Sequence, residues 1–225
     1  FSPDDRIGIV SLMDHTPGQR QFRDLSKMEE YMAGKYNMPK ADIYAHFDHL
    51  YALRDRYGII HEEAAAEMGK ELGAVLASHD DTTTADVLQS ASKGVAVAEF
   101  PTTLEAASEC NRNGISVMMG APNLLRGGSH SGNVAAHELA ANGLLDVLSS
   151  DYAPSSLLMG AVLLGLEAGD MAHGLGTVTA APAQAAGLQD RGRIAPGLRA
   201  DLVRFSVVGD LPSVKGVWRQ GYRVG

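Results

Sequence analysis

The sequence is poor in cysteine and in positive charge, and each shortage excludes a class of protein. Cys110 is the single cysteine, so no disulfide can form within the chain, and this usage suits a reducing compartment. Acidic residues outnumber basic ones by 27 to 19, which gives a net charge of −8. Because binding to nucleic acid needs a basic face, this balance argues against nucleic acid as a partner.

Long hydrophobic runs are also missing. The longest run covers residues 157–166 and is too short and too rich in glycine to cross a bilayer. The chain opens on an acidic segment that does not resemble a signal peptide. We therefore expect a cytoplasmic protein with no membrane partner. With 225 residues, 45% of them hydrophobic and 20% charged, the chain can bury a sizeable core.

Five short apolar runs recur along the chain, and polar side chains follow them. They cover residues 7–13, 75–78, 95–98, 115–119 and 144–150. Helical segments at 82–93, 102–112 and 132–141 lie between the later runs, the first with a threonine cap and each closed by a glycine. Strand–helix–strand units at short intervals predict parallel strands joined by right-handed crossovers. The predicted fold is therefore α/β: a partial (β/α)8 TIM-like barrel with about five of the eight strands.

Two further segments differ from this pattern. Residues 24–72 are charged and predicted to be mostly helical, with helices over 28–34, 41–57 and 62–72. They would form either part of the outer helical ring of the barrel or a lid over its strand ends. Residues 190–225 alternate turns and strands and predict a small β-structure outside the barrel. We accordingly predict a barrel domain over 1–189 and a second domain over 190–225.

His15, His79 and Asp151 each follow an apolar run, and barrels of this kind carry their chemistry at the strand ends. Neutral imidazole suits zinc and related divalent ions, and carboxylate oxygens complete such sites. A bound metal lowers the pKa of water from near 15.7 to roughly 7, and a carboxylate such as Asp151 can accept the proton. A hydrogen-bonded structural histidine is the alternative for either imidazole. The spacing alone names neither the metal nor the reaction.

Other residues are candidates for supporting roles. Backbone amides of a glycine-rich loop that opens a helix bind phosphate well, although a plain loop with a helix cap is the alternative. An arginine adds a fork of donors for the same purpose, or is only a surface charge. Carboxylates commonly orient ligating histidines. The candidates for phosphate binding are Arg20, Arg126, Gly128, Ser129, His130 and Asn133, and those for orienting ligands are Asp80 and Asp81. Glu99 would either orient a ligand or cap the helix that follows it.

Several motifs together resemble the PhnM family, the phosphonate-metabolism members of the amidohydrolase superfamily. They are residues 11–22, 77–82, 99–107, 120–136 and 148–152, and residues 190–203 resemble the return of the superfamily chain into its β-sandwich. The resemblance implies metal-dependent hydrolysis of α-D-ribose 1-methylphosphonate 5-triphosphate with release of pyrophosphate. The implied substrate is thus a small phosphorylated sugar phosphonate. The implied cofactor is one or two divalent ions, with zinc the expected metal.

Carried over residue by residue, the resemblance implies that His15 and His79 bind metal. It also implies that Asp151 binds metal and acts as the base. The family's first sandwich strands, three barrel strands and His-x-Asp metal pair have no counterpart here, so the chain resembles the C-terminal portion. Two alternatives stay open: a deaminase or cyclic-amide hydrolase of the same superfamily, and an inactive fragment. Because a partial barrel leaves open strand edges, we expect the chain alone either to be poorly soluble or to form a homodimer through such an edge.

Overall fold

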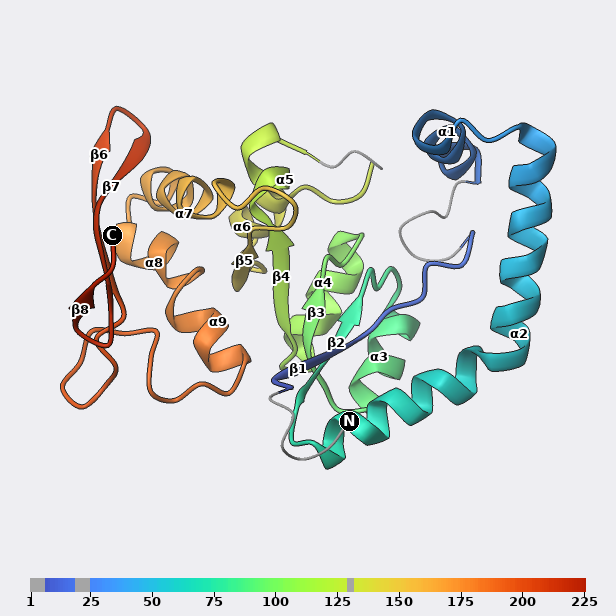
Figure 1. Cartoon of the computed structure of the whole chain (residues 1–225), viewed down its shortest axis with the longest axis horizontal. Coiled ribbons are helices and arrows are strands. Elements are labelled where there is room, and N and C mark those ends of the chain that lie inside the picture. The colour runs from blue at the N-terminus through green and yellow to red at the C-terminus, as the bar shows by residue number, and fades with distance from the viewer. Residues whose placement is uncertain (1–6, 19–24, 129–131) are drawn as a thin grey trace. The chain divides into compact units, whose positions relative to one another are not determined.

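The computed structural model describes residues 7–18, 25–128 and 132–225 (Figure 1). The described residues fall into two compact units. The first takes those up to Ile115 together with Gly132 and Asn133, and the second takes the remainder. Each unit contains parallel strands with helices between them, so the predicted α/β class is confirmed. The domain limit predicted at 189 stays a prediction.

The first unit is built on three parallel strands in the order β1 (Ile9–Leu12), β2 (Val75–His79) and β3 (Val95–Glu99). Helices α3 (Thr84–Ser92) and α4 (Leu104–Arg112) follow β2 and β3, as the strand–helix pattern predicts. Threonine caps begin both helices: Thr83 accepts a hydrogen bond from the amide of Asp86, and Thr103 accepts one from the amide of Ala106.

The long excursion between β1 and β2 forms two helices, α1 (Leu25–Tyr36) and α2 (Lys40–Glu71). The prediction of separate helices over 41–57 and 62–72 was wrong, because one helix, α2, runs through both ranges as far as Glu71 (Figure 1). Gly58 lies within this helix. A glycine within a helix costs only about 1 kcal/mol relative to alanine, which does not by itself end the helix. Ile43 and Phe47 of α2 are buried, and they form one hydrophobic cluster with Met28 and Met32 of α1.

The packing of α2 identifies the two faces of this sheet. A Cβ atom on Gly69 of α2 would lie 2.6 Å from the Leu76 side chain and 3.4 Å from that of Val10, so both side chains point toward α2. Side chains alternate between the faces along a strand. Ser11 comes one position after Val10 on β1, and His79 comes three positions after Leu76 on β2. Both side chains therefore point to the opposite face of the sheet. In a barrel, the face without helices is the inner one.

The second unit holds the parallel pair β4 (Ser116–Gly120) and β5 (Val147–Ser149). Its helices are α5 (Ala121–Arg126), α6 (Ala136–Ala141), α7 (Ser156–Glu167), α8 (Met171–Gly176) and α9 (Ala180–Ala185). The helix predicted over 132–141 begins only at Ala136, so its predicted start was wrong. Helix α5 was not predicted; Pro122 suits its first turn, and Gly127 ends it in the left-handed conformation.

The C-terminal region of this unit contains a three-stranded antiparallel sheet. Its strands are β6 (Leu202–Val208), β7 (Leu211–Arg219) and β8 (Tyr222–Arg223), in that order. This agrees with the β-structure predicted for the tail of the chain. Among the helices in the described ranges, none combines the length and the hydrophobicity needed to cross a membrane.

Candidate metal centre

The end of β2 brings two polar side chains to one place. His79 is the last residue of the strand, and Asp80 follows with a left-handed backbone, φ 57°. Aspartate is among the few residues other than glycine that adopt this conformation readily. The amide of Asp80 donates to the carbonyl of Glu99 at 2.8 Å, which ties the turn to the end of β3. Asp80 is buried, so its carboxylate has a fixed environment.

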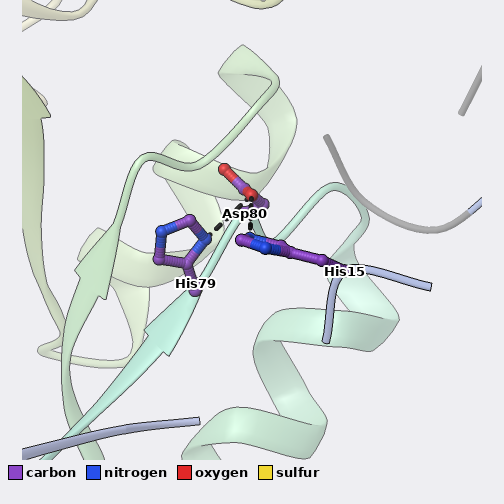
Figure 2. A group of neighbouring side chains, drawn as sticks. All are labelled: His15, His79 and Asp80. Atoms are coloured by element: carbon purple, nitrogen blue, oxygen red, sulfur yellow. Dashed lines mark hydrogen bonds and ion pairs between the residues drawn. The ribbon is translucent and has the colours of Figure 1, made fainter. Parts of the chain in front are cut away.

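His15, His79 and Asp80 form a compact cluster in the first unit (Figure 2). Oδ2 of Asp80 lies 2.8 Å from Nδ1 of His79 and 3.7 Å from Nε2 of His15. The two imidazole rings meet edge to face, with centroids 5.2 Å apart. One ligand atom from each residue falls within 4.8 Å of the others. Two imidazoles and a carboxylate are a donor set that suits zinc and similar divalent ions, so these residues fit a metal.

The loop that carries His15 is held by its neighbour Asp14. The Asp14 carboxylate accepts from the amide of Thr16 at 2.9 Å and from Nε of Arg54, on α2, at 2.7 Å. Partial burial raises the pKa of Asp14, but the hydrogen bonds from Thr16 and Arg54 outweigh this effect, and the pKa is lowered overall. The charged carboxylate therefore anchors the loop to α2. Sequence reasoning did not single out Asp14 or Arg54.

Phe100, which sequence reasoning also missed, packs against His79. Its ring centroid lies 5.3 Å from that of His79 in an edge-on arrangement. Its backbone is left-handed, with φ 56°. For a bulky residue this conformation is strained, and such strain concentrates at functional sites. The strained turn places an aromatic wall beside the histidine.

Asp81 has a different environment from Asp80. It is buried, and its carboxylate accepts from the hydroxyls of Ser78, on β2, and Ser90, on α3. Ser78 lies on the same face of the sheet as Leu76, where the helices pack. These contacts join α3 to β2, so they indicate a structural role for Asp81.

Replacing Asp81 by Ala is expected to lower the free energy of unfolding by roughly 2–4 kcal/mol, because two buried hydroxyls lose their acceptor. The melting temperature should then fall by about 4–16 °C in calorimetry, with the metal bound per folded molecule unchanged. Ser90→Ala removes one of the two donors and should cost less. Loss of metal at an unchanged melting temperature would contradict this structural assignment and favour the predicted contact with a metal ligand.

Asp151 lies in the second unit, two residues after the end of β5, and its backbone is left-handed with φ 48°. It is exposed to solvent. Gly120, at the end of β4, leaves room for its carboxylate: a Cβ at that position would lie 3.0 Å from Oδ2 of Asp151. The ends of β4 and β5 thus bring these two residues together. The proximity of Asp151 to His15 and His79 stays a prediction.

The loop predicted to bind phosphate lies between α5 and α6, and it does not lead directly into a helix with open amides. The first amide of α6, that of Ala136, already donates to the Asn123 side chain at 2.9 Å. Nη1 of Arg126 donates to the hydroxyl of Tyr152 at 2.6 Å, which directs the guanidinium toward the segment after β5. Gly128 donates to the carbonyl of Asn123. Asn133 belongs to the first unit, whereas Arg20, Ser129 and His130 lie outside the described residues.

Comparison with known proteins gives one curated relative and several solved structures. No family model matches the sequence. The chain is 47% identical over 221 residues to the α-D-ribose 1-methylphosphonate 5-triphosphate diphosphatase of Escherichia coli strain K12. The match covers 97% of this chain and 58% of the relative.

Three solved structures show the fold. A prolidase complexed with N-methylphosphonate-L-proline has a TM-score of 0.55 at 18% identity, covering 72% of this chain and 48% of its own. A molinate hydrolase scores 0.52 at 15% identity, covering 71% and 44%. An adenosine deaminase from Xanthomonas campestris with bound zinc scores 0.50 at 18% identity, covering 72% and 47%.

These likenesses show the fold: the chain has part of the barrel fold that these solved structures share. The chain is also a homologue of PhnM, the diphosphatase named above, so both the predicted fold and the predicted relationship are confirmed. The chain spans 58% of that relative's length.

Proposed function

We propose that this chain is part of a metal-dependent hydrolase that releases pyrophosphate from α-D-ribose 1-methylphosphonate 5-triphosphate. The identity of 47% over nearly the whole chain carries this proposal. The cluster of His15, His79 and Asp80 supports it, because it offers two imidazole donors and a carboxylate that orients one of them, where barrels of this class react. The proposed substrate is therefore a small phosphorylated sugar phosphonate.

We propose His15 and His79 as metal ligands and zinc as the metal. The donor set supports zinc, as does the zinc bound in the adenosine deaminase of similar fold. Two ligands of one tetrahedral zinc ion lie about 3.3 Å apart, whereas Asp80 and His79 approach to 2.8 Å, a hydrogen-bond distance. Asp80 accordingly orients His79 through Nδ1, which leaves Nε2 for the metal.

When bound, the metal activates water for attack. In the proposed reaction the water oxygen forms a bond to phosphorus, the bond to the bridging oxygen breaks, and pyrophosphate leaves with the 5-phosphate retained on the sugar. Asp151 accepts the proton of the attacking water. Arg126 binds the phosphate chain through its guanidinium fork, with Arg20, Gly128, Ser129, His130 and Asn133 as further proposed contacts.

The setting of this reaction is also a proposal. A cytoplasmic location is supported by Cys110, which is the single cysteine of the chain and is buried. The net charge of −8 supports a small-molecule partner over nucleic acid. A homodimer stays a prediction, and light scattering on the purified protein would test it.

We expect the full-length protein to release one pyrophosphate for each substrate molecule consumed, and to stop after a chelator removes its metal. Adding zinc back should restore the rate, because the proposed chemistry depends on the ion. A coupled pyrophosphate assay run beside an ammonia assay measures both outcomes. Ammonia release from an aminopurine or a cyclic amide, without pyrophosphate release, would replace this proposal by the deaminase or cyclic-amide hydrolase alternative.

A further inference from the structure

The turns after β2 and β3 repeat each other position by position. Each strand ends in a polar residue, His79 on β2 and Glu99 on β3. In each, the next residue has a left-handed backbone, with φ 57° at Asp80 and 56° at Phe100. Glu99 therefore stands at the position in its own turn that His79 occupies in the turn before.

The repeat continues into the following helices. The helix cap comes four positions after the strand residue in both turns, at Thr83 and at Thr103. The threonines just before the caps, Thr82 and Thr102, are both buried and share a hydrogen bond of 2.7 Å. The two turns thus have matching caps and are joined to each other by a hydrogen bond, so His79 and Glu99 hold equivalent positions.

Glu99 shares the inner face of the sheet with His79. The two residues are register partners on adjacent parallel strands, so their side chains point to the same side. That side is opposite to the one on which Val10 and Leu76 contact α2. The Glu99 carboxylate therefore lies on the inner face, at the carboxyl end of β3, where barrels of this class bind their substrates.

A structural role does not explain the position of the Glu99 carboxylate. It does not cap α4, because Thr103 is the cap. Its partner is Ser11, on β1, whose hydroxyl donates to Oε2 at 2.5 Å. It also lies outside the compact donor group, which among the described residues consists of His15, His79 and Asp80. A carboxylate accepts up to about four hydrogen bonds, so the bond from Ser11 fixes its position and leaves capacity for a ligand.

We propose that Glu99 is a substrate-binding residue whose carboxylate accepts hydrogen bonds from the sugar hydroxyls of the substrate. This rests on the proposed function, which supplies a substrate with both a sugar and a triphosphate. A carboxylate repels the phosphate chain, whereas hydroxyl groups are donors that an ionised carboxylate binds with charge-assisted hydrogen bonds. Glu99 thus faces the uncharged part of the substrate while arginine side chains bind its phosphates.

The test is Glu99→Gln in the full-length protein. Since hydrogen bonds to a charged group are worth more than neutral ones, we expect KM to rise about tenfold or more, with kcat and bound metal little changed. Inhibition by inorganic triphosphate, which has no sugar, should be unaffected. Ser11→Ala should raise KM by a smaller factor. Glu63→Gln, on the exposed surface of α2, is the matched control and should behave as wild type.

An unchanged KM in Glu99→Gln would overturn the assignment, as would loss of metal or equally weakened inhibition by triphosphate. Failure of the proposed function is a separate result, in which the wild-type protein itself releases no pyrophosphate. In that case calorimetry with ribose 5-phosphate and with inorganic triphosphate gives the answer directly. Weaker binding of ribose 5-phosphate alone supports the role of Glu99, and unchanged binding of both overturns it.

Discussion

A His79→Ala variant of the full-length protein is expected to lose its bound metal and its pyrophosphate release together. His79 supplies the ring nitrogen that Asp80 orients through a hydrogen bond of 2.8 Å, and alanine offers no donor in its place. Loss of an orienting partner alone lowers metal affinity by about 10- to 100-fold, so loss of the ligand itself should lower it further. Metal analysis after dialysis and steady-state pyrophosphate release measure the two effects.

His49→Ala is the matched control for this experiment. His49 is an exposed residue of α2 in the same unit, outside the donor cluster. Its loss should change neither metal content nor rate. The His79 side chain is only 12% exposed, so the melting temperature of both variants must be compared before the metal is measured. A folded His79→Ala protein with full metal and near-normal turnover would show that the ligand assignment is wrong.

The strands were predictable because their signal is local. A short apolar run bounded by polar residues marks a buried parallel strand, and each of the five predicted runs overlaps a strand of the structure. The positions of His79 and Asp80 follow directly, since they come immediately after such a run. Helix α2 was misjudged because it continues through Gly58 and the mostly exposed residues around it. A glycine costs only about 1 kcal/mol relative to alanine, which is too little to end a helix.

The supporting residues of the site were not predictable, because their roles come from contacts between distant parts of the chain. Asp14 binds Arg54, which is 40 residues away, and Ser11 binds Glu99, which is 88 residues away. Phe100 matters through a left-handed backbone that a bulky residue rarely adopts, so its sequence suggests nothing unusual. Local patterns therefore locate the strand ends, while the contacts that orient each side chain require the fold.

The loop after α5 is another segment whose contacts could not be predicted from local sequence patterns. Its glycines suggested a phosphate loop that opens a helix, yet α6 starts three residues beyond Asn133, and its first amide is already bound to Asn123. One partner of Arg126 is Tyr152, which is 26 residues away. Any phosphate contact here therefore depends on the arginine more than on a helix N-terminus.

Replacing Asp151 by Asn in the full-length protein should lower kcat by about a hundredfold to ten-thousandfold, the usual effect of losing a general base. Asparagine keeps the size of the side chain and also tolerates the left-handed backbone found at this position, φ 48°. It fits the same space beside Gly120 as well. The substitution therefore removes the basic oxygen with little change in shape, and the loss should appear in kcat rather than in folding.

Metal content separates this variant from His79→Ala. If Asp151 acts mainly on the proton, Asp151→Asn should retain more metal than His79→Ala while losing a comparable share of its turnover. Asp210→Asn, in the exposed turn between β6 and β7 of the same unit, is the matched control and should leave kcat unchanged. Near-normal kcat in a folded Asp151→Asn protein would mean that another group accepts the proton. Loss of metal as complete as in His79→Ala would instead make Asp151 chiefly a ligand, because a general base alone does not hold the ion.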